Sequence, residues 1–285
     1  MPVPVILLTA IMFTADLKVD HITIAARDLK QLQAQFASNG IPSEYGGKHT
    51  NGLTEMAIAS FADGSNLELI AAQKPTAGAA EHYWGKFIDA NAGPCAWAVS
   101  VPDVASAAPG LHPGRSGRLR PDGVKLEWES ASIGPEPQGE FFPFFIHDIT
   151  SRELRAFPHG SPSALAYSGV ASVVIGVRDL NIAIDRYRKT FRLPAPELQD
   201  DQTLQMHLAA FTGTPVILAS PMNRGTQLAK RMERFGEAPY AFILAPGEHF
   251  MFGAVGSPTK WFGNEFYWIE ALGSDHPWIG FRTKR

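Results

Sequence analysis

Two residues of types that bind metal ions occupy corresponding places in two predicted strands. His21 lies in the segment 19–26, where apolar and polar residues alternate, and Glu68 lies in the segment 64–71. Side chains alternate between the two faces of a strand, so each residue lies on the face opposite its strand's most apolar side chains. Imidazole and carboxylate groups are both ligands of divalent transition metals. The pattern predicts that two strands of one small sheet each turn a potential metal ligand to the same side.

The elements around these strands follow a strand–helix–strand–strand–strand order. Apolar residues at helical spacing predict a helix that begins at Leu29 and is closed by Asn39-Gly40. Strands at 43–48 and 53–61 precede the strand of Glu68, and a helix follows at 79–90. A second module is expected next, with strands at 94–101, 116–120, 124–132 and 141–148, followed by a linker at 151–167.

The pattern of the first half returns about 150 residues later in the chain. The segment 170–180 overlays 19–29 and keeps its Arg-Asp-Leu ending, and the segment 213–220 overlays 64–71. This repetition predicts an internal duplication in which each half holds two modules.

The second copy differs from the first at both potential ligands. Ser172 stands at the position of His21, and Ile217 stands at that of Glu68. A buried position accepts Ile in place of Glu only where no cation needs the carboxylate. We therefore expect that the second half has lost a metal site or never had one, since Glu270 in its last module is too little for a site by itself.

The strand of His21, the segment Tyr45 to His49 and the segment Asp63 to Ala71 together resemble the glyoxalase-like domain branch of the vicinal oxygen chelate superfamily. That superfamily includes glyoxalase, extradiol dioxygenases and bleomycin-resistance proteins. The resemblance implies an α+β protein of βαβββ modules paired into curved-sheet cups around a divalent metal, the glyoxalase/bleomycin resistance/dihydroxybiphenyl dioxygenase fold. We expect an N-terminal extension at 1–18, a glyoxalase-like domain with the metal site at 19–160, and a degenerate glyoxalase-like half at 161–285.

The resemblance suggests a third ligand from the second module. Phe145 and His147 share a face of its last predicted strand, so His147 is expected where Glu68 lies in the first module. His21, Glu68 and His147 together would form the two-imidazole, one-carboxylate set of the facial triad, which suits Fe(II), Mn(II), Ni(II) or Zn(II). The superfamily usually draws a ligand from the first strand of the partner module, and this chain departs from that pattern near Ala96. The alternative is a buried His21–Glu68 hydrogen-bonded pair and a core histidine at His147.

Two residues of the first module are candidates for acid–base catalysis. Glu55 would be a general base if burial beside a metal-bound substrate raised its pKa toward neutrality. His49 could also reach the cup. The alternatives are a solvated glutamate and a loop histidine.

Four residues of the second module are candidates for substrate binding. Arg118, Arg120 and Trp128 resemble a hairpin of the same family that would close over a substrate carboxylate or ring. Phe145 would offer apolar surface to a flat ligand. Surface arginines and a core tryptophan are an equally good interpretation.

Composition and charge exclude several classes of function. The chain has 285 residues, 45% of them hydrophobic, and its net charge of −3 provides no basic surface for nucleic acid. Its single cysteine, Cys95, cannot form an internal disulfide, which is compatible with the cytoplasmic location that we expect. The apolar run at 3–13 lacks a positively charged start and is too short to span a membrane, so it favours an extension over a signal peptide.

These patterns predict a metal-dependent enzyme of the vicinal oxygen chelate type, with isomerase, lyase or dioxygenase chemistry on a small substrate that carries vicinal oxygens. The sequence lacks dinucleotide-binding and phosphate-loop motifs and Gly-x-Ser-x-Gly, which disfavours nucleotide-driven and acyl-enzyme chemistry. The expected partner is a small molecule, without nucleic acid or membrane, and a homodimer stays open. The alternative function is non-catalytic binding or sequestration of a small molecule, as in resistance proteins.

Overall fold

The computed structural model describes residues 17–74, 83–108, 110–134, 137–250, 258–269 and 278–282. The predicted N-terminal extension up to residue 16, the start of the helix predicted at 79–90, and Glu270 lie outside the described residues.

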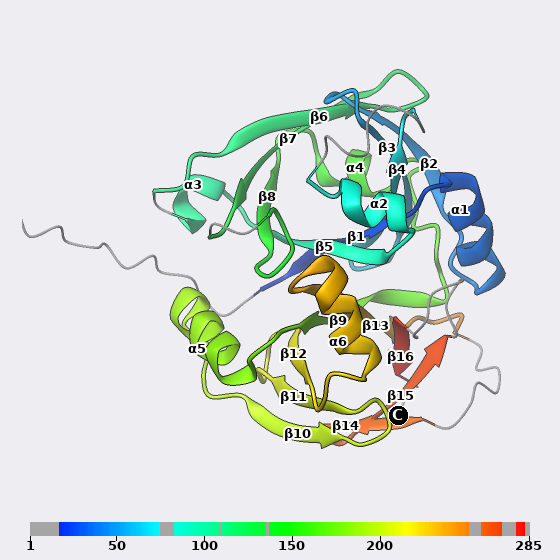
Figure 1. Cartoon of the computed structure of the whole chain (residues 1–285). Helices are drawn as coiled ribbons and strands as arrows, with labels where there is room; N and C mark the ends of the chain where they lie inside the picture. The colour runs from blue at the N-terminus through cyan, green and yellow to red at the C-terminus, as the bar shows by residue number, and fades with distance from the viewer. Residues whose placement is uncertain are drawn as a thin grey trace, which may run out of the picture.

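The first half of the chain forms a closed eight-stranded barrel with the strand order β1-β4-β3-β2-β6-β7-β8-β5 (Figure 1). Its first module runs β1-α1-β2-β3-β4 and its second β5-α3-β6-β7-β8, and antiparallel contacts of β1 with β5 and of β2 with β6 join the two. The elements are β1 (Val19–Ala25), α1 (Leu29–Ser38), β2 (Glu44–His49), β3 (Thr54–Ser60), β4 (Asn66–Ala72), α2 (Gly85–Ala90), β5 (Gly93–Ser100), α3 (Val104–Ala107), β6 (Gly114–Leu119), β7 (Lys125–Ser132), β8 (Phe144–Asp148) and α4 (Arg152–Ala156).

The second half repeats this arrangement as an eight-stranded sheet ordered β10-β11-β12-β9-β13-β16-β15-β14. Its elements are β9 (Tyr167–Gly176), α5 (Leu180–Phe191), β10 (Glu197–Asp201), β11 (Met206–Ala210), β12 (Val216–Pro221), α6 (Gln227–Phe235), β13 (Ala238–Pro246), β14 (Thr259–Trp261), β15 (Asn264–Ile269) and β16 (Ile279–Arg282). The repeated modules confirm the predicted fold class. None of the helices in the described ranges is long and apolar enough to cross a membrane.

The repeated Arg-Asp-Leu segment has a local structural role in both halves. Asp28 caps α1 by accepting a hydrogen bond from the backbone N–H of Gln31, and Asp179 caps α5 by accepting one from Ile182. An aspartate side chain satisfies one of the backbone donors left free in the first turn of a helix. In both halves this tripeptide therefore lies where the first strand ends, and its aspartate starts the helix that follows.

One segment differs from its prediction as a plain linker. Residues 151–167 contain the short helix α4, which carries Arg152 and Arg155 back toward β1. Its stabilising contacts are ion pairs with distant strands, which no local pattern in the sequence reveals.

The two halves pack against each other through an aromatic and polar interface. Phe87 stacks on Phe235 with ring centroids 4.9 Å apart, and the Tyr187 hydroxyl donates to the carbonyl of Phe141 at 2.5 Å. The buried guanidinium of Arg231 donates to the carbonyls of Ala92 and Pro94. This interface lies outside the barrel interior, which is left free for a cavity.

Candidate active site in the N-terminal barrel

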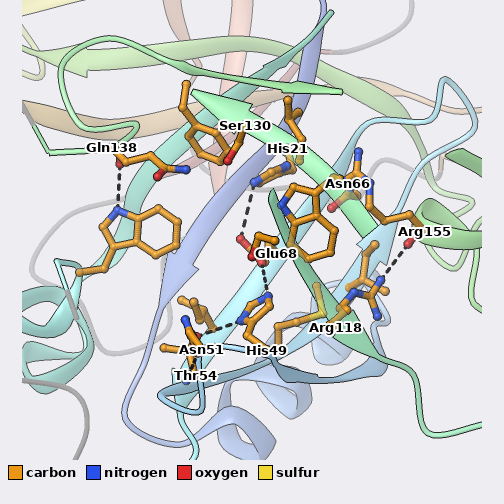
Figure 2. A pocket seen from close by; sticks show the side chains of 18 of the residues that line it. His21, His49, Asn51, Thr54, Asn66, Glu68, Arg118, Ser130, Gln138 and Arg155 are labelled. Carbon is orange, nitrogen blue, oxygen red and sulfur yellow. Dashed lines mark hydrogen bonds and ion pairs between the residues drawn. The ribbon is translucent and has the colours of Figure 1, made fainter. Parts of the chain in front are cut away.

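The barrel encloses a cavity of about 160 Å³ into which residues of both modules project (Figure 2). His21 on β1, His49 at the end of β2 and Glu68 on β4 line it from the first module. Arg118 on β6 and Trp128 on β7 line it from the second. His49 and Arg118 are neighbours in register across the β2–β6 junction, so the strand pair that closes the barrel also brings these two side chains together.

The Glu68 carboxylate lies at the centre of the polar contacts in this cavity. His49 Nε2 lies 3.2 Å from Glu68 Oε1, and His21 Nε2 lies 3.6 Å from Glu68 Oε2. The Thr23 hydroxyl, beside Glu68 in the β1–β4 pair, donates to Oε2 at 2.9 Å. Burial alone would raise the pKa of Glu68, but the hydrogen bond from His49 and the charges of the two imidazoles lower it to about 2. Glu68 is therefore a carboxylate at neutral pH.

Both imidazole rings are held by their other nitrogen. His21 Nδ1 lies 2.6 Å from the carboxylate of Asp20, and His49 Nδ1 lies 2.9 Å from the hydroxyl of Thr54. These contacts turn the Nε2 atom of each ring toward Glu68. An imidazole oriented by a carboxylate or hydroxyl on one nitrogen is typical of metal-ligating and acid–base histidines.

Asp20 is itself held by a buried network of charges. Arg155 Nη2 lies 2.8 Å from Asp20, Arg152 also pairs with Asp20, and Asp148 at the end of β8 accepts from both arginines. Burial would raise the pKa of Asp20, but Arg155, His21 and Arg152 hold it well below its usual value. This network ties β1, β8 and α4 together and keeps a charged acceptor beside His21.

Arg118 is a buried cation in the cavity wall. Its side chain is 2% exposed, and it donates to the backbone carbonyl of Gly46 and, at 2.9 Å, to that of Arg155. Burial and the like charge of Arg155 lower its pKa to about 10, which leaves it protonated at neutral pH. Glu68 acts on it electrostatically, which opposes this lowering of the pKa, but among the described residues no carboxylate forms a direct ion pair with it.

Aromatic side chains form the apolar walls. Phe144 on β8 meets the His21 ring edge-on at 5.4 Å, and Trp128 meets the His49 ring edge-on at 6.3 Å. Trp84 packs against Phe144 and donates its indole N–H to the carbonyl of Gln138 at 3.0 Å. The imidazoles are thus enclosed by rings that limit the access of water.

The sequence profile of the glyoxalase-like domain family matches residues 19–191. The chain belongs to the glyoxalase-like domain family. This finding confirms the resemblance drawn from the sequence, and the glyoxalase-like barrel described above lies entirely within the matched range.

Solved structures share the fold of this glyoxalase-like protein at low sequence identity. A hypothetical protein from Staphylococcus aureus has a TM-score of 0.61 at 12% identity, covering 93% of this chain and 98% of its own. A mutant 4-hydroxymandelate synthase from Streptomyces coelicolor has a TM-score of 0.52 at 12% identity, covering 81% of this chain and 71% of its own. No curated protein matches the chain. At such identities the likeness extends to the fold alone.

The glyoxalase-like barrel brings together five of the residues predicted for the site and excludes four. Those that line the cavity are His21, His49, Glu68, Arg118 and Trp128. Those that do not are His147, Phe145, Glu55 and Arg120.

The prediction that His147 faces the cavity is wrong because of the alternation along β8. Phe144 and Ile146 line the cavity, so Phe145 and His147 lie on the opposite face. Phe145 belongs to the hydrophobic core, and His147 interacts electrostatically with Asp103, the residue that caps α3. The third imidazole or carboxylate near His21 and Glu68 is His49, from the same module.

The same alternation corrects Glu55 on β3. Thr54 and Met56 line the cavity, so Glu55 points outward, where it accepts a hydrogen bond from the Tyr45 hydroxyl at 2.7 Å. Its predicted role as a buried general base does not fit this position.

Arg120 lies beyond the end of β6 and is also turned away from the cavity. It pairs with Asp122 and donates to the carbonyls of Leu154 and Pro158. It stabilises the connection to α4 instead of lining the cavity.

Asp20 and Arg155 have central positions that the sequence did not indicate. Asp20 precedes His21 on β1, and alternation assigns the two residues to opposite faces. The contact between Asp20 Oδ1 and His21 Nδ1 is seen only in the structure. Arg155 lies in the segment predicted as a linker. In the described part of the chain, no group of three or more His, Cys, Asp and Glu residues is arranged so that it could hold a metal ion as it stands. Glu68 pairs directly with both imidazoles.

Proposed function

We propose that this chain is an enzyme of the vicinal oxygen chelate type that acts on a small oxygen-bearing substrate, and that His21, His49 and Glu68 hold its divalent cation. The observation that supports this most strongly is the convergence of two Nε2 atoms on one ionised carboxylate inside the barrel cavity. Two imidazoles and one carboxylate leave coordination positions for a substrate, and superfamily members commonly use divalent metals.

The donor types suit such an ion, and their separations from Glu68 need only a small adjustment to bind it. Two ligand atoms bound at about 2.1 Å to one ion lie about 3.0 to 3.4 Å apart, depending on the coordination geometry. The separations of 3.2 Å and 3.6 Å from Glu68 to His49 and His21 are close to that range. Asp20 and Thr54 supply the outer contacts that keep both rings in place.

A bound divalent cation would supply Lewis-acid polarisation of a substrate oxygen. The residues of the chain prepare the site for it. Asp20 holds Nδ1 of His21 so that Nε2 points into the cavity, where it would bind the cation once deprotonated, and Thr23 holds the Glu68 carboxylate. Trp128 and Phe144 exclude water from the reacting groups. Isomerase, lyase and dioxygenase reactions all use this kind of centre, and Cys95, buried and unpaired, agrees with a reducing cytoplasm.

Metal analysis tests the proposal directly. The protein is purified without added metal, titrated separately with Fe(II), Mn(II), Ni(II) and Zn(II), and analysed for bound metal and affinity. We expect one ion per chain, and a loss of affinity of at least about tenfold in each of His21→Ala, His49→Ala and Glu68→Gln.

His147→Ala is the matched control, because it removes an imidazole from the same barrel but from the face opposite the cavity. It should bind metal like the unaltered protein. A protein that binds none of the four ions, or one in which His147→Ala is affected and His49→Ala is not, would contradict the proposed ligand set.

The second candidate function is binding of a small molecule without turnover. The aromatic walls from Trp84, Trp128 and Phe144 support it independently of the polar centre. A protein that binds flat ligands in the absence of metal, with the same affinity in His49→Ala, would favour this function.

A further inference from the structure

We propose that the ligand of this cavity is a small monocarboxylate with a flat body about the size of one six-membered ring, and that Arg118 binds its carboxylate. This inference names a substrate class for the proposed active site. The part that concerns chemistry at the other end of the ligand rests on the proposed function. The binding of the carboxylate rests on Arg118 and the cavity alone.

The charge of Arg118 is the first step. A guanidinium has five N–H donors, and Arg118 uses donors on two backbone carbonyls, those of Gly46 and Arg155. Glu68 acts on this buried charge electrostatically but does not pair with it directly, so an anion that enters the cavity gains a direct ion pair that the described residues do not provide.

The other buried arginines of the described barrel have different surroundings. Arg155 pairs with Asp20 and Asp148, and Arg120 pairs with Asp122. Neither has a free charge to offer to a ligand. Arg231, in the interface between the halves, is enclosed by backbone carbonyls and does not line the cavity. Arg118 is therefore the cation that combines burial, exposure to the cavity and the absence of a carboxylate contact among the described residues.

The position of Arg118 is fixed by its neighbours. A Cβ atom added to Gly46 would lie 2.1 Å from the sulfur of Met56 and 3.0 Å from Arg118 Nη1, so the glycine gives both side chains the room that they occupy. The guanidinium is held against the backbone of β2, beside His49. A carboxylate bound there lies at the same end of the barrel seam as the imidazole.

The size and walls of the cavity define the rest of the ligand. A cavity of about 160 Å³ is close to the engineered cavities of about 150 Å³ that accept benzene. Trp128 and Phe144 offer ring surfaces, and Ile70 and Ile146 are among the aliphatic side chains that line the rest of the cavity. Figure 2 shows Arg118 on one side of Glu68 and Gln138 on the other, so a molecule bound at Arg118 extends past the polar centre.

Titration with benzoate and with its neutral analogue benzamide tests the inference. Tryptophan fluorescence reports binding, because Trp84 and Trp128 line the cavity. In the unaltered protein, with metal removed by a chelator, we expect benzoate to bind at least about tenfold more tightly than benzamide. This comparison needs no variant and so does not depend on a variant's folding.

Variants locate the carboxylate. Arg118→Met should weaken benzoate binding by about tenfold or more and leave benzamide binding unchanged, while Arg118→Lys should retain part of the preference. Arg115→Met is the matched control, since Arg115 lies on the same strand but its side chain is 77% exposed and pairs with Glu129. It should bind like the unaltered protein.

The outcomes separate this inference from the proposed function. Benzoate preference that persists in the chelator and disappears in Arg118→Met supports the inference, whether or not the protein binds metal. Benzoate binding that requires metal and is unchanged in Arg118→Met places the carboxylate on the cation and overturns the inference while the proposed function stands. Equal affinity for benzoate and benzamide in the chelator also overturns it.

Discussion

The two halves of this protein share one fold but differ at the residues that form the polar centre of the first half's cavity. In the β1–β4 pair Thr23 lies beside Glu68, and in the corresponding β9–β12 pair Val174 lies beside Ile217. Ile217 is buried in the hydrophobic core, as Val174 is. The same fold therefore forms in the second half without these polar residues, so the architecture itself does not require them.

The halves also differ at the seam where two modules meet. In the first half β2 and β6 pair directly, which places His49 beside Arg118. In the second half the described strands β10 and β14 lie at the two ends of the sheet, and the side chain of Gln199 connects them by bonding to the backbone of Lys260 and Phe262. Closing the barrel by a strand pair creates the part of the site that the second half lacks.

The sharpest way to test this comparison is to give the first half the residue of the second. We expect Glu68→Ile to abolish stoichiometric metal binding and to lower metal affinity by about a hundredfold or more, because a ligand is removed outright. The fold should persist, since Ile217 occupies the same place in β12. Metal analysis together with circular dichroism checks both parts. Retained metal binding would show that Glu68 is not a ligand.

Removal of Arg155 should have the largest effect on stability. Arg155→Met leaves the buried Asp20 with Arg152 as its remaining arginine partner, and breaking a buried ion pair from one side destabilises a protein by about 3 to 5 kcal/mol. Urea unfolding measures this change. Arg152→Met, at a side chain that is 23% exposed, is the control and should lose less. Equal losses would mean that the network is not centred on Arg155.

The reverse exchange places a carboxylate in the second half. Ile217→Glu should destabilise the protein by about 3 kcal/mol at neutral pH, because Ser172 replaces the imidazole at the position of His21 and Val174 replaces the hydroxyl at that of Thr23. Burial raises the pKa of such a carboxyl, so its folded pKa lies above the unfolded value and stability should recover as the pH falls. Urea unfolding at pH 7 and pH 5 tests this, and a variant that is equally stable at both values would contradict it.

Acid should weaken the first half before the second. The pKa of Glu68 is lowered from 4.5 to about 2, and that of Asp20 lies well below its ordinary value of 3.8. Groups with a depressed folded pKa stabilise the protein above their unfolded pKa and lose this contribution as the pH falls toward the folded pKa. For Glu68 the loss is on the order of 3 kcal/mol between about pH 5 and about pH 2.

Hydrogen exchange measured at decreasing pH distinguishes the halves. Amides of β1 and β4 should lose protection at a higher pH than those of β9 and β12. The Glu68→Ile variant is the control for the carboxylate, because it should lack the part of the acid response that belongs to Glu68. Parallel loss of protection in both halves would contradict the assignment.

Much of this site could be predicted from local patterns. Alternation along one strand places His21 and Glu68 on inward faces, and the duplicated segments identify Ser172 and Ile217 as their counterparts. Alternation shows which side chains of a strand share a face, however, and does not show which of the two faces points into the barrel. For β8 it did not reveal whether His147 or its neighbour Ile146 faces the cavity, and the chosen face was the wrong one.

The sequence by itself determined the order of the modules, the helix that begins at Leu29, and the duplication, because each depends on residues within a few positions or on a repeated pattern. Only the tertiary structure decided that His49 and Arg118 meet at the β2–β6 seam. It also decided that Arg155 forms an ion pair with Asp20, the carboxylate that holds the ring of His21. The physical reason is that these contacts depend on barrel closure and on buried charges finding partners far away in the chain, and neither leaves a periodic signal in the sequence.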